Sequence, residues 1–282
     1  MTNFSRRSVL QMATGIASAY ALSNATGCAT PPQAPAAARP TLSTGSFVSK
    51  ARGGVETHWM IARPPGQTQP LRPIIALHGW GQNALEVMNM GAVKILADTT
   101  ADLLPPVAFV TVDGGTTYWH QRASGEDAGA MVLDELLPML PSQGLDTSRV
   151  AFMGWSMGGY GALLLGARLG AARTAAICAV SPALYSPPAP NTFPAPPQFP
   201  AEGFDDAHDY AANSVWGPNG VPDVPIRIDC GESDQLLPAT KAFVAQLKPP
   251  PVTKFSPGGH NHAYWDAQLP DEMRWIIPFL AA

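Results

Sequence analysis

The sequence predicts an α/β fold with a mostly parallel central sheet, an antiparallel hairpin at its N-terminal side, and helices on both faces. Short unbroken apolar runs recur along the 282 residues, which is typical of strands buried on both faces. They fall at residues 73–77, 107–112, 150–155, 175–180 and 225–230. Stretches with helical patterning separate them, and this alternation indicates parallel strands joined by helical crossovers. A hydrophobic content of 46% is sufficient for a sizeable core.

Residues 1–27 have the character of an export signal. Arg6 and Arg7 give a charged start of the twin-arginine type, and a short, weakly apolar stretch at residues 9–22 follows. That stretch is too short, and too rich in Ser, Thr and Gly, to span a membrane comfortably. Small residues then precede Cys28, as in a bacterial lipoprotein cleavage site, so we expect Cys28 to be lipidated. The alternative is an ordinary signal cleavage nearby, with Cys28 incidental.

The expected domain organisation follows from this start. Residues 28–42 form a Pro/Ala-rich tether, and residues 43–282 form the α/β domain. We expect an exported protein of the cell envelope, which contacts the membrane only through a lipid at Cys28, or is otherwise secreted. The net charge of −4 comes without a basic stripe, which argues against a nucleic-acid partner. The oligomeric state is left open.

The two remaining cysteines, Cys178 and Cys230, fall in predicted buried strands. An exported protein permits a disulfide, but adjacent parallel strands rarely give the required geometry. Two buried free thiols are therefore expected.

The other elements can be placed in chain order. Residues 45–50 and 55–61 alternate in polarity around a glycine turn and predict the hairpin. An edge strand is expected at residues 252–255. Helices are expected at residues 86–100, 125–140, 157–169 and 238–247, and at the C-terminus.

Residues 182–224 interrupt this alternation. Repeated prolines forbid a long helix before Asp205, so the segment is an insertion over the face where the strands end. A lid over the site is one interpretation. A passive excursion of the chain is the other.

The organising feature is Gly154-Trp155-Ser156-Met157-Gly158, which lies between an apolar strand and a helix. A strand, a sharp turn and a helix would present the Ser156 hydroxyl clear of the sheet, in a strained backbone conformation. Glycines two residues on either side let the strand and the helix approach closely. A Gly-x-Ser-x-Gly pentapeptide can also arise by chance in a chain with 26 glycines, but the strand and helix around this one favour a nucleophile.

Two backbone N–H groups are candidates for stabilising an oxyanion. Met157 follows the serine at the start of the helix, where free N–H groups and the helix dipole favour negative charge. Trp80 lies in the loop His78-Gly79-Trp80-Gly81 after another central strand and is the expected second donor. His78 itself is taken as a core residue.

Four aromatic residues are the predicted substrate-binding residues. Tyr118, Trp119 and His120 belong to a loop that leaves the C-terminal end of a strand, where open α/β sheets bind ligands. Trp155 precedes the serine. Packing of the loop against the protein surface is the alternative.

Serine needs a neighbouring base, and that base needs an acid to orient it. Asp234 is the predicted acid because it follows the strand at residues 225–230 in a polar turn. Asp229 competes for the role but lies inside the strand, and Glu232 follows the strand too early.

His260 is the predicted base. It follows a double glycine after the edge strand, which lets the backbone turn the ring inward, and it is preferred to His262 for that reason. Ser156, Asp234 and His260 each follow a strand, so one edge of the sheet can bring them together.

These loops resemble those of the esterase D group of esterases within the α/β-hydrolases, a group that includes S-formylglutathione hydrolases and secreted mycolyltransferases. The resemblance rests on the serine pentapeptide, the His78-Gly79-Trp80 loop, and Gly259-His260 with Tyr264-Trp265 behind it, within residues 45–281. It implies the α/β-hydrolase fold. It also implies Ser156 as nucleophile, Asp234 as acid, His260 as base, and the N–H groups of Trp80 and Met157 as the oxyanion hole.

The sequence departs from the two named relatives in different ways. Mycolyltransferases take their acid from a glutamate elsewhere, whereas Gly231-Glu232-Ser233-Asp234 looks like the formylglutathione-hydrolase arrangement. An exported chain is in the wrong compartment for glutathione metabolism. Neither substrate is therefore carried over.

The predicted function is that of an exported serine esterase, which hydrolyses small-molecule or lipid esters through an acyl-enzyme. No metal or organic cofactor is implied, because nothing has metal-ligand spacing. Acyl transfer to an alcohol through the same acyl-enzyme is one alternative, and a peptidase would share the machinery. A non-catalytic surface binding protein on a hydrolase scaffold is another.

Overall fold

The computed structural model describes residues 41–185, 203–217 and 220–281. They belong to one compact unit that spans Ala37–Ala282. The predictions for the export signal, for Cys28 and for nearly all of the tether lie outside the described residues. In the described ranges, no helix is both long enough and apolar enough to cross a lipid bilayer.

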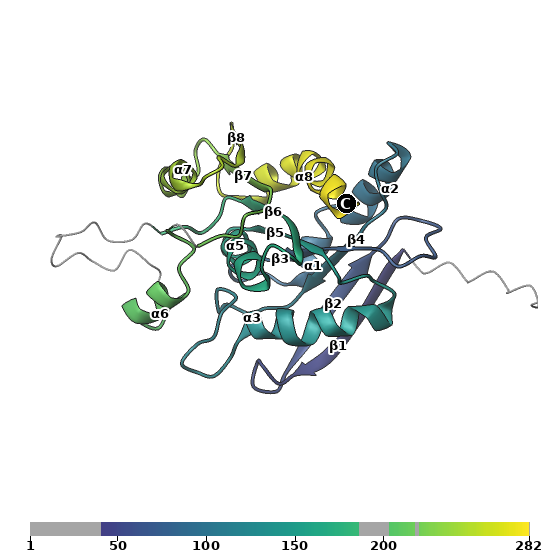
Figure 1. The fold of residues 1–282 in the computed structure, drawn as a ribbon, viewed down its shortest axis with the longest axis horizontal. Coiled ribbons are helices and arrows are strands. Elements are labelled where there is room, and N and C mark those ends of the chain that lie inside the picture. The colour runs from purple at the N-terminus through teal and green to yellow at the C-terminus, as the bar shows by residue number, and fades with distance from the viewer. Residues whose placement is uncertain (1–40, 186–202, 218–219, 282) are drawn as a thin grey trace, which may run out of the picture. The chain divides into compact units, whose positions relative to one another are not determined.

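The core of the unit is an eight-stranded sheet in the order β1-β2-β4-β3-β5-β6-β7-β8 (Figure 1). β1 pairs antiparallel with β2, and β2 pairs antiparallel with β4, whereas all later neighbours are parallel. The predicted hairpin and the mostly parallel sheet are both confirmed. The strands are β1 (Leu42–Ser49), β2 (Val55–Ala62), β3 (Pro73–Leu77), β4 (Ala108–Val112), β5 (Val150–Trp155), β6 (Thr174–Val180), β7 (Ile226–Gly231) and β8 (Val252–Ser256).

Helices cover both faces of this sheet, as expected for strands buried on both sides (Figure 1). Buried side chains of α1, α2 and α8 join one core cluster, and those of α5, α7 and the helical segment from α3 to η2 join the other. The helices are α1 (Ala84–Met88), α2 (Ala92–Ala101), α3 (Ala128–Ala130), η1 (Met131–Leu136), α4 (Leu137–Met139), η2 (Leu140–Gln143), α5 (Met157–Leu169), α6 (Ala207–Ala212), α7 (Leu237–Gln246), α8 (His262–Ile276) and η3 (Ile277–Leu280).

Two predicted helices differ from those observed. The helix expected at residues 86–100 is two helices, because the chain breaks at Gly91, which has a left-handed φ of 103°. The helix expected from residue 125 begins only at Ala128, because the Asp127 side chain accepts a hydrogen bond from the N–H of Ala130 and caps it there.

The insertion at residues 182–224 is described only in part. Its residues 186–202 and 218–219 lie outside the described ranges, so the lid interpretation stays a prediction. The described part contains α6, and Phe204 packs beside it against Tyr210 and Tyr160. Cys178 and Cys230 are free and buried, as expected.

The face of the sheet under α8 holds a buried carboxyl that has no hydrogen-bond partner among the described residues. Both carboxyl oxygens of Glu272 are unpartnered, although the side chain is fully buried. Nearby, the Asp229 carboxylate accepts hydrogen bonds from the Arg227 guanidinium and forms an ion pair with it. Burial, and secondarily the charge of Asp229, raise the pKa of Glu272 well above its ordinary value.

We therefore expect Glu272→Gln to stabilise the protein increasingly as the pH rises. The folded state keeps a proton on Glu272 that the unfolded chain loses above its ordinary carboxyl pKa, so stability falls through that window as the pH rises. The neutral amide removes this loss, which grows by about 1.4 kcal/mol for each pH unit within the window. Urea unfolding at pH 5 and pH 8 measures the gain. The exposed Glu56→Gln is the control, and equal effects of both variants at pH 8 would contradict the expectation.

Candidate active site

Ser156 lies directly after β5, at the first position beyond the strand, and α5 begins with the next residue. Its φ of 56° and ψ of −118° give the sharp turn that the sequence predicted. A Cβ on Gly154 would lie 2.2 Å from the carbonyl oxygen of Gly158, and a Cβ on Gly158 would lie 1.9 Å from the carbonyl oxygen of Leu77. Both glycines are therefore required for α5 to pack against the ends of β5 and β3.

His260 connects the nucleophile to the acid. Its Nε2 lies 2.8 Å from the Ser156 Oγ, and its Nδ1 lies 2.9 Å from the Asp234 Oδ2. Because an imidazole can accept at one nitrogen while it donates from the other, this arrangement makes a continuous chain of hydrogen bonds. The structure thus brings together the three residues predicted as nucleophile, base and acid.

The loops that carry the acid and the base are bonded to each other. After β7, the N–H of Glu232 donates to the carbonyl of Ser256, and the N–H of Ser233 donates to the carbonyl of Gly258. A Cβ on Gly231 would lie 2.4 Å from that same Gly258 oxygen, so the two backbones are in close contact. This contact sets Asp234 beside the loop that ends in His260.

The Asp234 carboxylate is buried and held by several donors. Its Oδ1 accepts a hydrogen bond from the N–H of Leu236 at 2.8 Å. Burial by itself would raise the pKa of Asp234, but hydrogen bonds from His260, the Leu236 N–H and Ser181 outweigh it and hold the pKa below the ordinary value. Asp234 is therefore kept as the anion that a catalytic histidine needs beside it.

The competing candidates lie elsewhere. Asp229 belongs to β7 and is bound to the Arg227 guanidinium at 2.6 Å. Glu232 is exposed. The His262 Nε2 lies 2.6 Å from the Gln82 amide, and its ring is about half exposed. Within the described ranges, none of these three side chains forms a hydrogen bond or an ion pair with Ser156 or Asp234.

The two expected oxyanion donors lie at the same edge of the sheet as Ser156. Met157 is the first residue of α5, and Trp80 lies in the loop after β3, which pairs with β5. Neither N–H donates a hydrogen bond to another described residue. Trp80 is 54% exposed, so this residue is available to a ligand.

Gln82 and Ser181 also contribute to the site, and sequence reasoning missed both. The Gln82 Oε1 accepts from the Gly79 N–H at 2.8 Å, which fixes the loop that carries Trp80. Ser181 follows β6 directly and contacts the acid. Gln82 lies shortly after β3 and Ser181 directly after β6. Their positions after these strands are the only feature of the sequence that could have indicated a role at the site.

The predicted substrate-binding aromatics are all buried in the structure. Trp119 and Trp155 are buried in the two core clusters. Tyr118 packs against Phe204, and His120 stacks on the same ring with both its nitrogens near backbone carbonyls. The expectation is corrected for Tyr118, Trp119 and His120, because the loop after β4 folds inward and packs against the described part of the insertion. It is corrected for Trp155 because this residue belongs to the buried strand β5.

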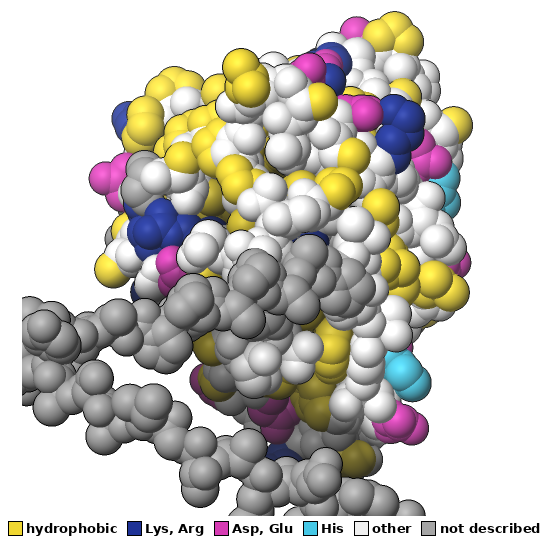
Figure 2. Space-filling model, turned by 90° about the vertical axis from the view of Figure 1, so that its right-hand side faces the viewer, with side chains coloured by type: hydrophobic (Ala, Val, Ile, Leu, Met, Phe, Trp, Pro, Cys, Tyr) yellow, Lys and Arg dark blue, Asp and Glu magenta, His cyan; other side chains and the backbone are white. Residues whose placement is uncertain are grey.

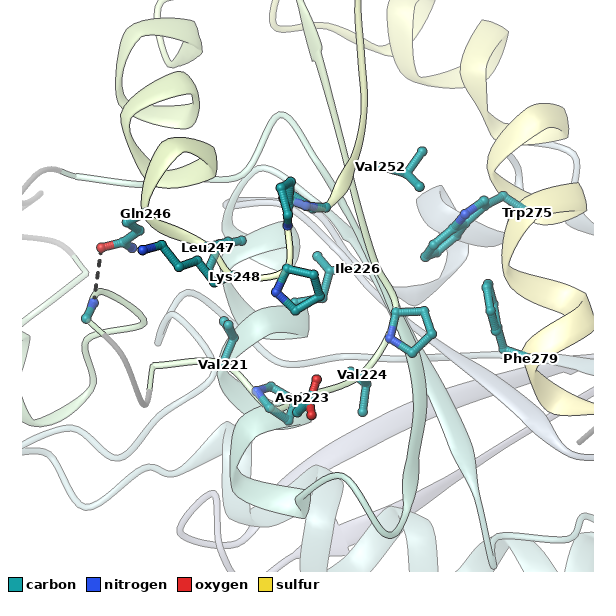
Figure 3. A pocket seen from close by; sticks show the side chains of 16 residues that line it. Val221, Asp223, Val224, Ile226, Gln246, Leu247, Lys248, Val252, Trp275 and Phe279 are labelled. Atoms are coloured by element: carbon teal, nitrogen blue, oxygen red, sulfur yellow. Dashed lines mark hydrogen bonds between the residues drawn. The ribbon is translucent and has the colours of Figure 1, made fainter.

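One open cavity lies away from these residues. A cavity of about 600 Å³ is lined by Trp275, Phe279 and several prolines near the N-terminal ends of β7 and β8 (Figure 3). That is the opposite edge of the sheet from Ser156. On the face shown in Figure 2, acidic and basic side chains lie close to one another among hydrophobic ones. Within the described ranges, no cluster of His, Cys, Asp or Glu is arranged to hold a metal ion.

Residues 51–276 match the model of the Esterase family, described as "Putative esterase". The chain belongs to this esterase family. It is accordingly a carboxylic-ester hydrolase. No curated protein sequence matches the esterase.

Solved structures share the fold of the esterase at low sequence identity. An S-formylglutathione hydrolase from Agrobacterium tumefaciens gives a TM-score of 0.68 at 16% identity, covering 86% of this chain and 98% of that chain. Fluorophosphonate-binding serine hydrolase F of Staphylococcus aureus gives 0.67 at 17% identity, covering 84% and 98%. A ferulic acid esterase from Anaeromyces mucronatus gives 0.65 at 14% identity, covering 88% and 94%. These likenesses show the α/β-hydrolase fold.

Proposed function

We propose that the esterase hydrolyses carboxylic esters through a triad of Ser156, His260 and Asp234. The observation that carries this proposal is the hydrogen-bond chain from the Ser156 Oγ through both nitrogens of His260 to Asp234. A serine hydroxyl is a weak nucleophile at neutral pH, and a bonded imidazole that can take its proton activates it. The aspartate orients the ring and stabilises the imidazolium that forms.

Acylation follows from these positions. The Ser156 Oγ attacks the ester carbonyl carbon while its proton passes to the His260 Nε2. The negative charge that develops on the carbonyl oxygen is stabilised by the N–H groups of Met157 and Trp80. When the tetrahedral intermediate collapses, the C–O bond to the alcohol breaks, and His260 returns the proton to the leaving alkoxide. The acyl group is then esterified to Ser156.

Deacylation repeats the same steps with water. His260 takes a proton from the water as its oxygen attacks the acyl carbon. Collapse of the second intermediate releases the carboxylic acid and returns the proton to Ser156. An alcohol in place of water would give acyl transfer, so the same chemistry serves the transferase alternative.

The substrates are proposed to be small-molecule or lipid esters. Proteins of the same fold are named as an S-formylglutathione hydrolase and as a ferulic acid esterase in complex with ferulic acid. The indole of the half-exposed Trp80, beside one of the proposed donors, offers an apolar wall for one side of such a substrate.

Export belongs to the proposal as well. The twin arginines, the short apolar stretch and the small residues before Cys28 support secretion, with lipidation at Cys28 and a tether that leads to β1. The esterase would then act in the cell envelope on substrates outside the cytoplasm.

We expect the esterase to hydrolyse p-nitrophenyl esters, with an optimum chain length set by the acyl site. The test measures release of p-nitrophenol over a series from acetate to long-chain acyl groups, with and without an alcohol acceptor. Acyl product on the added alcohol in excess of free acid would assign the protein as a transferase. No turnover of any ester in the series would contradict the general esterase proposal and favour a binding protein.

A further inference from the structure

Ser181 has an unfavourable backbone conformation next to the triad. It is the first residue after β6, it is fully buried, and its φ is 44°. Glycine adopts this left-handed region freely, whereas a residue with a Cβ does so at a cost. A serine at this position therefore indicates that its side chain compensates for the strain.

The backbone around Ser181 is bonded to both neighbouring strand ends. Its N–H donates to the carbonyl of Asp229 in β7 at 2.7 Å. Two residues later, the N–H of Ala183 donates to the carbonyl of Ser156 at 2.9 Å. The turn thus lies between the strand that leads to the acid and the backbone of the nucleophile.

The Ser181 hydroxyl is bound from two sides. The indole Nε1–H of Trp265 donates to the Ser181 Oγ at 3.1 Å. On its other side, the hydroxyl lies beside the Asp234 carboxylate and the Cys230 thiol. Because the indole can only donate, it occupies an acceptor site on the Oγ and leaves the hydroxyl proton free to point at Asp234.

Trp265 contacts the other partner of Asp234 as well. Its ring meets the His260 ring edge to face, with centroids 5.1 Å apart and planes at 86°. Trp265 is buried in α8, and Asn261 caps the start of that helix next to His260. One indole therefore touches the base and, through Ser181, the acid.

We propose that Ser181, oriented by the Trp265 indole, is a positioning residue that fixes the Asp234 carboxylate and, through it, the His260 ring in line with Ser156. The four side chains form a circuit: Trp265 donates to Ser181, Asp234 is bonded to His260, and the His260 ring meets that of Trp265, while the Ser181 hydroxyl lies beside the Asp234 carboxylate. Loss of the hydroxyl opens the circuit, and the carboxylate can then rotate away from Nδ1. This inference rests on the proposed triad.

The test compares the full chain with Ser181→Ala, Ser181→Gly and Trp265→Phe. Ser49→Ala is the matched control. Ser49 is also a buried serine, and its hydroxyl donates a hydrogen bond to the Glu135 carboxylate, but it lies in the edge strand β1, away from the triad. Three quantities are measured: kcat and KM on a p-nitrophenyl ester, the downfield proton NMR resonance of the His260 Nδ1–H, and the melting temperature. The resonance reports the His260–Asp234 hydrogen bond without any turnover.

We expect Ser181→Ala and Ser181→Gly to lower kcat alike, roughly 10–100-fold, with little change in KM, as for a small misplacement of catalytic groups. The His260 resonance should broaden or disappear in both. Their melting temperatures should differ, because glycine relieves the strain at φ 44°. Both variants lack the hydroxyl, so equal losses of kcat despite different melting temperatures would tie the activity to the hydroxyl. A serine with only a structural role would instead give losses of kcat that vary with the melting temperature. Trp265→Phe should lower kcat by a smaller factor, and Ser49→Ala should leave both kcat and the resonance unchanged.

Several outcomes would overturn the proposal. The first is a Ser181→Ala variant whose kcat is within about threefold of the wild type and whose His260 resonance is retained. The second is a Ser181→Ala variant that loses kcat but keeps the resonance. The third is a wild-type protein that does not show the resonance. If Ser181→Ala does not fold, Ser181→Gly decides, since glycine accepts this backbone conformation. A wild type that shows the resonance but hydrolyses no ester refutes the proposed function alone, and loss of the resonance in the serine variants would still support the positioning role.

Discussion

Ser156→Ala is expected to lower kcat/KM for ester hydrolysis by at least ~10³-fold, because the members of a catalytic triad act as a unit. The substitution removes the Oγ that lies 2.8 Å from the His260 Nε2 and leaves the backbone turn in place. Alanine meets the same φ of 56° as serine, so the melting temperature should change little. Initial rates over a range of ester concentrations measure the loss.

The control for this prediction is Ser142→Ala, an exposed serine in η2 whose hydroxyl donates to a nearby carbonyl. It should keep wild-type rates. Residual activity of Ser156→Ala within tenfold of the wild type would mean that another group supplies the nucleophile.

Among substitutions that add a single methyl group at the site, Gly158→Ala is expected to lower the stability of the protein most. The added Cβ would lie 1.9 Å from the carbonyl oxygen of Leu77 and 2.8 Å from that of His78. Both are backbone atoms at the end of β3, so they cannot move aside as a flexible side chain would. α5 must shift away from the sheet, which we expect to cost about 3 kcal/mol or more.

Thermal unfolding tests this expectation, with a decrease of roughly 6–12 °C for a domain of this size. Gly91→Ala, just before α2, is the control. There the nearest atom to an added Cβ is 4.0 Å away, and only the left-handed backbone with φ 103° and ψ 15° disfavours it, at about 1 kcal/mol. Similar melting temperatures for the two variants would show that the helix can relax around the added methyl group.

The sequence was sufficient to identify the strands and the residues that follow them. Ser156, Asp234 and His260 each come after a predicted strand, and parallel strands bring such positions to one edge. The choice of Asp234 over Asp229 also rested on position, because a carboxyl inside a strand points into a packed layer. In the structure Asp229 is buried against Arg227.

Other features depend on contacts that no sequence pattern carries. Trp119 was expected in a substrate pocket, but its ring fills the space left open by Gly114 and Gly161, which lie far apart in the sequence. Gln82 and Ser181 are single polar residues in loops, and their roles depend on which side chain the fold places opposite them. The break at Gly91 was missed because the residues on both sides of it have helical patterning.

The central claim is that Ser156 is the covalent nucleophile, and trapping with a fluorophosphonate tests it most directly. Such reagents phosphonylate an activated serine and remain attached, so intact-protein and peptide mass spectrometry locates the adduct. We predict one adduct per chain, on Ser156, which does not form in Ser156→Ala and forms much more slowly in a His260→Ala variant. An adduct on another residue, or an unmodified wild type after prolonged exposure, would contradict it.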